Sequence, residues 1–111
     1  KDGNFQIARN GWIADYNDPC SFLDMWYTDG GNNDAQYSNP DYDAAIDAAK
    51  ATSDPEERMK AFHEAEDILI GQDSVLAPIY FYTQPYMLNP DIDGMYYTPL
   101  GYFFFGYTSK K

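Results

Sequence analysis

The amino-acid sequence predicts a mixed α/β fold, in which two helices lie between two segments of strand-like pattern. Each helix is indicated by a start signal, a capping side chain followed at once by proline, at Asn39-Pro40 and at Asp54-Pro55. The strands are indicated by alternation of apolar and polar residues near the N-terminus and by an apolar, aromatic run in the last third. A length of 111 residues fits one domain or a part of a larger one.

The first predicted strand covers residues 5–14, where apolar side chains alternate with polar ones before a short apolar run. A turn is predicted at residues 15–19, because Asn and Asp side chains there can bond their own backbone. Residues 21–27 predict a short helix, and residues 29–33 predict a loop because they contain two adjacent glycines.

Both predicted helices carry an apolar stripe at helical spacing, which predicts one buried face for each. The stripe of the first helix comprises Tyr42, Ala45, Ile46 and Ala49. In the second helix, Glu57 follows the capping residue by three positions, and Gly71 stands where the helix is expected to end. Its stripe comprises Met59, Phe62, Ala65, Ile68 and Leu69.

The acidic and the aromatic residues are concentrated in different parts of the chain. Residues 38–74 carry ten acidic and three basic side chains, which indicates solvated helical surface. Residues 75–111 hold 11 of the 20 aromatic side chains and predict buried strand or interface. Residues 75–82 form the clearest strand pattern of this part, with Pro78 implying an edge position or a bulge.

The composition excludes several classes of function. A net charge of −11 argues against binding to nucleic acid, whose phosphates need Lys and Arg, and against binding to an anionic membrane surface. One Cys and one His provide neither an internal disulfide nor a structural zinc site, so neither metal nor cofactor is expected. An acidic chain with 18% aromatic residues is typical of extracytoplasmic binding proteins and of glycan-binding modules.

Three patterns that can carry chemistry have simpler structural interpretations. Asn89, Asp91, Asp93 and Gly94 match the first half of a calcium-binding loop, but the twelfth position is not Glu, so a turn is favoured. Cys20 and His63, the sole candidate thiol–imidazole pair, are expected to be a packed cysteine and an exposed helical histidine. Paired carboxylates are too numerous to single out a glycosidase site. We therefore predict no catalytic residues.

Asp15 is the most informative acidic residue, because it follows the apolar run that ends the first predicted strand. A carboxylate beside an indole at such a position can accept a charge-assisted hydrogen bond from a cationic ligand group. The alternative is a turn or a cap for the following helical segment. On the residues alone, the turn is favoured.

Several ordered motifs resemble the oligopeptide-binding proteins of bacterial ABC importers, the family 5 solute-binding proteins. The resemblance begins with Gly-Trp-Ile-Ala-Asp-Tyr-Asn-Asp-Pro at residues 11–19 and continues with Phe22-Leu23 and Asn32-Asn33. It includes residues 37–43, Arg58 with Ala65-Glu66, and Ala-Pro-Ile-Tyr-Phe-Tyr at residues 77–82. It covers residues 5–89 in order, with Cys20 in place of the small hydroxyl residue that relatives often have.

The resemblance implies that the chain is a C-terminal fragment of a two-lobe binding protein with a periplasmic-binding-protein-like (type II) fold. Residues 1–74 would belong to the peptide-facing lobe, and residues 75–111 would form an aromatic segment that returns toward the other lobe. The implied function is to bind extended oligopeptides outside the cytoplasm and to deliver them to ABC transporter permease subunits. A leader or lipid anchor is expected to lie outside this chain, and the isolated fragment is expected to self-associate through its exposed edges.

The resemblance also implies roles for individual residues. The strand near residues 10–14 would pair with the main chain of the peptide, as in strand addition. Asp15 would take the α-ammonium of the peptide, and Trp12 would line a side-chain pocket. The other implied ligand-binding residues are Arg9, which can reach a ligand carboxylate, Gly11 and Ile13 on the pairing strand, and Asn32 and Tyr82 as lining residues.

Two further functions are compatible with the composition. A free-standing glycan-binding module would use Tyr and Trp with acidic partners, and a hydrolase fragment would use an Asp or Glu pair. Composition alone favours the peptide-binding fragment and the glycan-binding module equally. The ordered motifs favour the peptide-binding fragment.

Overall fold

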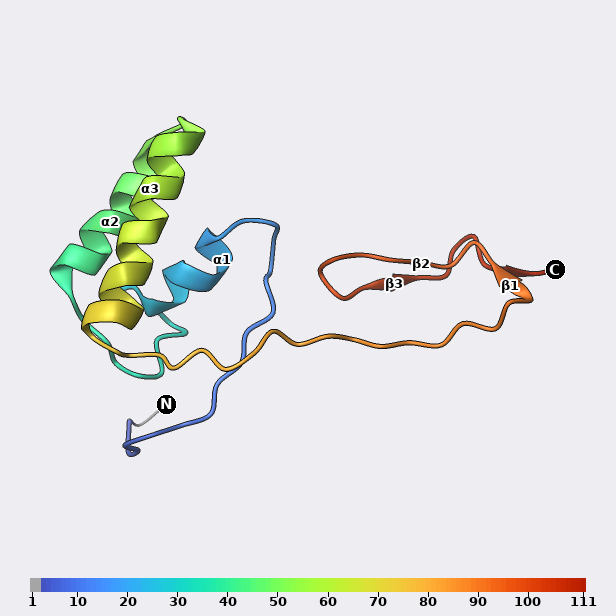
Figure 1. Cartoon of the computed structure of the whole chain (residues 1–111), viewed down its shortest axis with the longest axis horizontal. Coiled ribbons are helices and arrows are strands. Elements are labelled where there is room, and N and C mark those ends of the chain that lie inside the picture. The colour runs from blue at the N-terminus through green and yellow to red at the C-terminus, as the bar shows by residue number, and fades with distance from the viewer. Residues whose placement is uncertain (1–2) are drawn as a thin grey trace. The chain divides into compact units, whose positions relative to one another are not determined.

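The computed structural model describes residues 3–111, which fall into two compact units. The first unit extends to Pro78 and is helical, whereas the second begins at Ile79 and contains short strands (Figure 1). The mixed content agrees with the predicted fold class, with three α-helices and two small two-stranded sheets among the described residues.

The helical unit is built around an antiparallel pair of helices. α2 (Pro40–Ala51) and α3 (Pro55–Glu66) lie side by side, and α1 (Cys20–Leu23) packs against α3 (Figure 1). A 3₁₀ turn, η1 (Asp24–Trp26), extends α1, and a π-helical segment, η2 (Asp67–Gln72), extends α3.

The predicted start signals of α2 and α3 are confirmed. The side chain of Asn39 accepts hydrogen bonds from the backbone N–H groups of Asp41 and Tyr42, at 2.9 and 3.4 Å. Asp54 accepts from the two equivalent N–H groups of α3, at 2.9 and 3.0 Å. These bonds satisfy backbone donors that have no partner within the helix, and proline at the first position removes another.

One core fills the space between the helices. The predicted stripe of α2 is buried in full, and Phe62 and Ala65 of α3 are buried with Ile68 and Leu69 of η2. Met59 is the exception, because 41% of its surface is exposed. The buried stripe of α3 begins at Ala61, and the guanidinium of Arg58 lies over the Phe62 ring. Met59 lies outside this stripe.

The end of α3 differs from the prediction. Gly71 was expected to stop the helix, but the backbone continues through it in wider π-helical turns to Gln72. The N–H group of Asp73 donates to the carbonyl oxygen of Ile68 at 2.9 Å, which closes the last wide turn. The chain then leaves the helix through Ser74, which has a positive φ of 51°.

The two predicted strands at residues 5–14 and 75–82 are wrong, because neither segment forms a ladder among the described residues. Alternating side chains favour extended backbone, but a strand also requires a neighbour to bond its N–H and C=O groups. Residues 3–111 supply no such neighbour to either segment.

The second unit has two antiparallel strand pairs. β1 (Ile92–Asp93) pairs with β4 (Ser109–Lys110), and β2 (Tyr96–Tyr97) pairs with β3 (Phe103–Phe104). In the β2–β3 pair the rings of Tyr96 and Phe104 stack with centroids 4.8 Å apart, which is a typical cross-strand aromatic contact.

The calcium-like motif is a turn, as the sequence favoured. The Asn89 side chain accepts a hydrogen bond from the N–H of Asp91 at 2.9 Å, and Asp93 lies in β1. Gly94 has φ +77°, and a Cβ there would lie 2.0 Å from the carbonyl oxygen of Tyr107, so the turn requires glycine. No cluster of three metal-ligating side chains occurs among residues 3–111.

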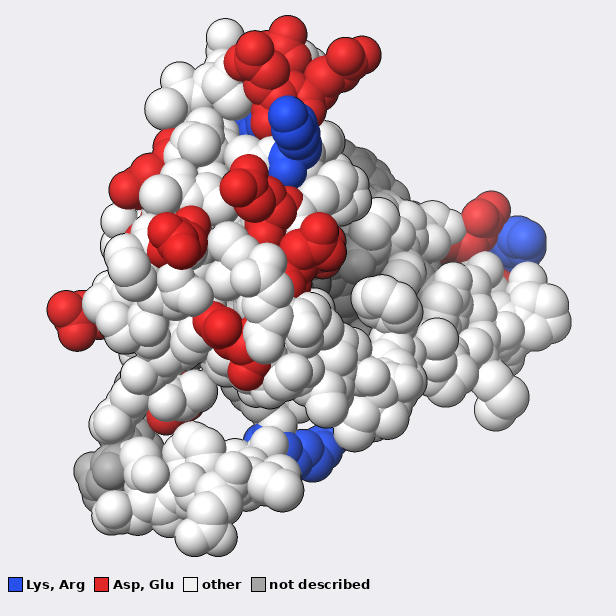
Figure 2. Space-filling view, turned by 60° about the vertical axis from the view of Figure 1, so that its left-hand side comes forward, with Lys and Arg blue, Asp and Glu red and all other residues white. Residues whose placement is uncertain are grey.

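Residues 38–74, which contain α2, α3 and η2, carry ten of the 18 acidic side chains. Figure 2 shows them distributed over the helical unit. They include Asp41, Asp47, Glu56, Glu57, Glu64 and Asp67, all exposed. Within residues 3–111, none of the helices has the length and apolar character needed to cross a membrane.

Candidate functional site

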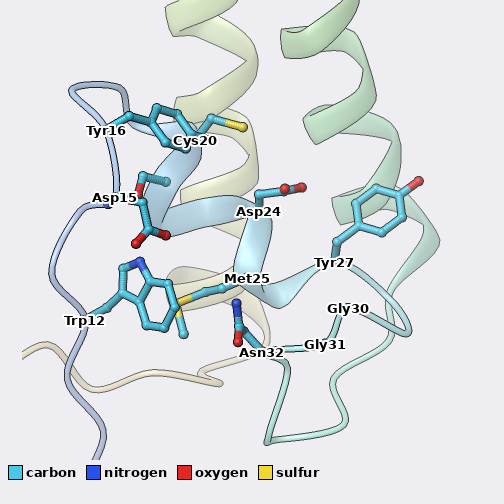
Figure 3. A pocket seen from close by; sticks show the side chains of 11 residues that line it. Trp12, Asp15, Tyr16, Cys20, Asp24, Met25, Tyr27, Gly30, Gly31 and Asn32 are labelled. Atoms are coloured by element: carbon cyan, nitrogen blue, oxygen red, sulfur yellow. Dashed lines mark hydrogen bonds between the residues drawn. The ribbon is translucent and has the colours of Figure 1, made fainter.

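A pocket of about 320 Å³ lies in the helical unit, between residues 12–16, the α1–η1 segment and the loop that follows it (Figure 3). Three of the predicted ligand-binding residues, Trp12, Asp15 and Asn32, line this pocket. The rest of its wall consists of Tyr16, Cys20, Ser21, Asp24, Met25, Tyr27, Gly30 and Gly31.

Asp15 is fixed through its backbone. Its N–H group donates to Ser21 Oγ at 2.8 Å, and Ser21 is buried in α1. The carboxylate of Asp15 points toward the edge of the Trp12 indole that carries the nitrogen (Figure 3). Within residues 3–111, Asp15 has no salt-bridge partner.

Trp12 contributes an apolar face and a polar atom to the pocket. The residue is half-buried and packs against the core, and its Nε1 atom is fully buried with no hydrogen-bond partner among the described residues. Buried donors of this kind are uncommon in folded proteins and mark sites where a further acceptor is expected. The wall of the pocket therefore contains a carboxylate with a buried N–H donor beside it.

The side chain of Asp18 bonds the backbone at the start of α1. Asp18 Oδ1 accepts a hydrogen bond from the N–H of Cys20, at the start of α1, at 2.9 Å. Arg58 of α3 binds the same carboxylate in a bidentate manner, with Nη1–Oδ2 at 2.6 Å and Nη2–Oδ1 at 2.9 Å. Hydrogen bonding to Arg58 lowers the pKa of the Asp18 carboxyl.

The other ionisable groups of the pocket have partners within the chain. Asp24 is 2.5 Å from Nζ of Lys50, whose ammonium lies over the Tyr27 ring. The hydroxyl of Tyr27 donates to Asp47 at 3.0 Å, and this bond raises the pKa of the phenol. A hydrogen bond with Cys20 raises the pKa of Tyr16 to about 12. Near neutral pH both phenols are therefore uncharged.

Asn33 supports the far wall of the pocket from inside and was missed by the sequence analysis. Its side chain is 9% exposed, and its Nδ2 donates to the carbonyl oxygens of Tyr27 and Tyr37, at 3.1 and 2.7 Å. Its Oδ1 accepts from the N–H of Tyr37 at 3.0 Å. These bonds hold the Gly30–Gly31–Asn32 loop, whereas Asn32 itself is exposed.

The remaining predicted ligand-binding residues do not line the pocket. Arg9, Gly11 and Ile13 are exposed on the extended segment that precedes Asp15, with Ile13 at 73% exposure. Trp12 is half-buried against the core, whereas the neighbouring Ile13 is exposed. Tyr82 belongs to the second unit and is 63% exposed.

Cys20 and His63 lie in different environments. Cys20 is buried in α1, whereas His63 is on the exposed face of α3, with Nδ1 3.5 Å from Glu66. Both agree with the predicted structural roles, a packed cysteine and an exposed histidine.

Acidification is expected to weaken the contact between α1 and α3. Because the folded-state pKa of Asp18 lies below its ordinary value of 3.8, its stabilising contribution is complete above that value. The contribution is lost as the pH falls through the lowered pKa. We expect Asp18→Asn to be less stable than the wild type in urea at neutral pH, and the difference to shrink on acidification. Asp34→Asn, at an exposed position, is the control and should follow the wild type throughout.

Comparison with curated proteins reveals clear relatives, although no protein-family model matches the chain. The periplasmic oligopeptide-binding protein OppA of Haemophilus influenzae is 40% identical over 92 residues, which are 83% of this chain and 17% of that protein. The dipeptide-binding protein DppE of Bacillus subtilis is 35% identical over 98 residues, 88% of this chain and 18% of that protein. The chain is homologous to the family 5 oligopeptide- and dipeptide-binding proteins. The periplasmic oligopeptide-binding protein OppA of Salmonella typhimurium is 37% identical over 92 residues, which are 83% of this chain and 17% of that protein.

The homology confirms the resemblance found in the motifs. The chain spans less than one fifth of the length of these relatives and so corresponds to a fragment of such a protein. Each relative is named as a binding protein rather than as an enzyme, in agreement with the prediction that the chain is not an enzyme. Two of them are named as periplasmic, which agrees with the predicted extracytoplasmic location.

Proposed function

We propose that this chain forms part of one lobe of a type II periplasmic-binding-protein-like fold and contributes to the binding of extended peptides. In this proposal residues 1–74 belong to the peptide-facing lobe and residues 75–111 return toward the second lobe. Closure of the lobes would present the peptide to the permease subunits of an ABC transporter. Homology to oligopeptide- and dipeptide-binding proteins supports the ligand class.

The observation that carries the proposal is the position of Asp15. Its carboxylate borders the pocket beside the indole of Trp12, and within residues 3–111 it has no cationic partner. A peptide α-ammonium supplies the missing positive charge together with up to three N–H donors. The Trp12 ring gives an apolar wall to the first side chain.

The extended segment before Asp15 provides a surface for the main chain of the peptide. Residues 3–14 form no ladder with any other described segment, which supports strand addition there, with the N–H of Gly11 already donating to Asn10 Oδ1 at 2.7 Å. In this arrangement Gly11 and Ile13 pair through their backbone and Arg9 reaches a carboxylate of the ligand. Asn32 lines the opposite wall of the pocket, and the role of Tyr82 as a lining residue remains a prediction from the resemblance. Water can fill the pocket volume that a small side chain leaves empty.

The role of Asp15 is tested by calorimetry with a full-length protein that carries this chain. We expect Asp15→Asn to weaken binding of a peptide with a free amino terminus by about 10–100-fold, the effect of losing a charge-assisted hydrogen bond. N-acetylation of the peptide should cause a similar loss in the wild type and no further loss in the variant. Asp34→Asn, which removes one exposed carboxylate outside the pocket, is the matched control.

Two results would contradict the proposed function. If N-acetylated and free peptides bind the wild type equally well, Asp15 does not bind the ammonium. Retention of the protein on insoluble polysaccharide, abolished by Trp12→Ala, would instead support a glycan-binding function.

A further inference from the structure

We propose that Arg58 is a positioning residue for ammonium recognition, acting on Asp15 through Asp18 and α1. The inference rests on the proposed function, because it concerns the geometry of the carboxylate to which that function assigns the ligand ammonium. Arg58 lies on α3 and does not line the pocket. Its effect on the ligand is therefore indirect.

Two sets of hydrogen bonds, joined by the peptide bond between Cys20 and Ser21, lead from α3 to Asp15. The guanidinium of Arg58 binds both oxygens of Asp18, and Asp18 Oδ1 also accepts from the N–H of Cys20. The next residue, Ser21, is 6% exposed and accepts the N–H of Asp15 at 2.8 Å. The segment that carries Asp15 is thus tied to α1 at Ser21, and α1 is tied to α3 at Asp18.

The α3 end of this series is anchored in the core. The guanidinium carbon of Arg58 lies 4.7 Å from the centroid of the Phe62 ring, and Phe62 is 2% exposed. A planar guanidinium held over a buried ring, with two parallel bonds to one carboxylate, has a defined orientation that a lysine ammonium does not reproduce.

The α1 end depends on this anchor because the helix is too short to be stable by itself. α1 has four residues, and its N-cap position is Pro19, which makes no side-chain capping bond. Asp18 takes over that role through the N–H of Cys20. Removal of Arg58 leaves Asp18 free to turn toward solvent, so that the start of α1 and the attached Asp15 lose their fixed position.

The consequence for binding is selective. A carboxylate that moves relative to the pocket loses the directional hydrogen bond to an ammonium, whereas apolar and main-chain contacts with the ligand are less sensitive to its position. Arg58 should therefore affect the preference for a free amino terminus more than the affinity for peptides in general.

The test measures the ratio of affinities for a free and an N-acetylated peptide of the same sequence, in the full-length protein. We expect Arg58→Met, which keeps an unbranched apolar side chain, to reduce this ratio about tenfold. Arg58→Lys should retain part of the ratio, because a single charged bond to Asp18 remains. In the Asp15→Asn background, Arg58→Met should have no further effect on the ratio. Lys60→Met removes a positive charge from an exposed position of α3 and should leave the ratio unchanged.

Each other result overturns the inference in a distinguishable way. If Arg58→Met weakens both peptides equally, Arg58 stabilises the lobe without positioning Asp15. If Asp15→Asn reduces the ratio but Arg58→Met does not, the positioning role is wrong and the proposed function stands. If Asp15→Asn itself leaves the ratio unchanged, both are wrong.

Discussion

Phe62→Ala is expected to lower the free energy of unfolding by about 3–5 kcal/mol, the usual cost of removing a buried aromatic side chain. Phe62 is 2% exposed and belongs to the same buried cluster as Tyr42, Ile46 and Leu69, the other fully buried large side chains. Its ring also supports the guanidinium of Arg58, so the variant loses a cation–π contact in addition to apolar burial.

Urea unfolding followed by circular dichroism measures this effect, and Met59→Ala provides the matched control. Met59 lies on the same helix and belongs to the stripe predicted from the sequence, but it is 41% exposed. We expect its replacement to cost under about 1 kcal/mol. Phe62→Leu keeps most of the apolar volume and should lie between the two. Equal losses for Phe62→Ala and Met59→Ala would mean that the buried face of α3 is not the one described.

The helices could be predicted because their determinants are local. Asn39 and Asp54 cap N–H groups two and three residues away, and each is followed by a proline that fits the first helical position. The stripes follow from the same periodicity. Met59 was misplaced because helical spacing gives the period of a stripe but leaves its edges to the packing of the neighbouring elements.

The sequence predicted strand within residues 75–111, where β1 to β4 lie, but the positions and partners of the strands could not be predicted from local pattern. Alternation at residues 5–14 shows which side chains share a face of an extended segment, but it does not show whether another segment lies beside it. Of the two pairs that form, β1–β4 joins segments far apart in sequence, such as Ile92 with Lys110, whereas β2–β3 pairs Tyr97 with Phe103 across a short turn.

In the pocket, too, some residues could be predicted from local sequence motifs, whereas contacts between distant segments could not. Trp12 and Asp15 could be selected from one motif, and Asn32 from a second. The contact of Asp18 with Arg58 joins residues 40 positions apart, and no pattern in either segment indicates it. Asn32 and Asn33 are adjacent and identical in type, so only the conformation of the loop backbone determines that Asn33 is the buried one.

Asn33→Asp is expected to lower the free energy of unfolding by about 2–4 kcal/mol at neutral pH, the cost of burying an unsatisfied charged group. The amide donates to the carbonyl oxygens of Tyr27 and Tyr37. A carboxylate of the same shape cannot donate, so it would place a negative charge against both of these oxygens. Only the bond from the N–H of Tyr37 to the side-chain oxygen would remain.

Asn32→Asp adds the same charge one residue away, at an exposed position, and should change stability by less than about 0.5 kcal/mol.

The pH dependence of the free energy of unfolding separates the two variants further. Burial against carbonyl oxygens raises the pKa of the carboxyl introduced at position 33, so its cost is absent below the unfolded-state pKa near 4. As the pH rises above the unfolded-state pKa, the loss of stability grows, and it becomes constant once the pH exceeds the raised pKa of the folded state. Urea unfolding across this range should show Asn33→Asp approaching the wild type in acid, because a protonated carboxyl regains one donor. Equal stability of the two variants at neutral pH would show that the pocket loop does not depend on the buried amide of Asn33.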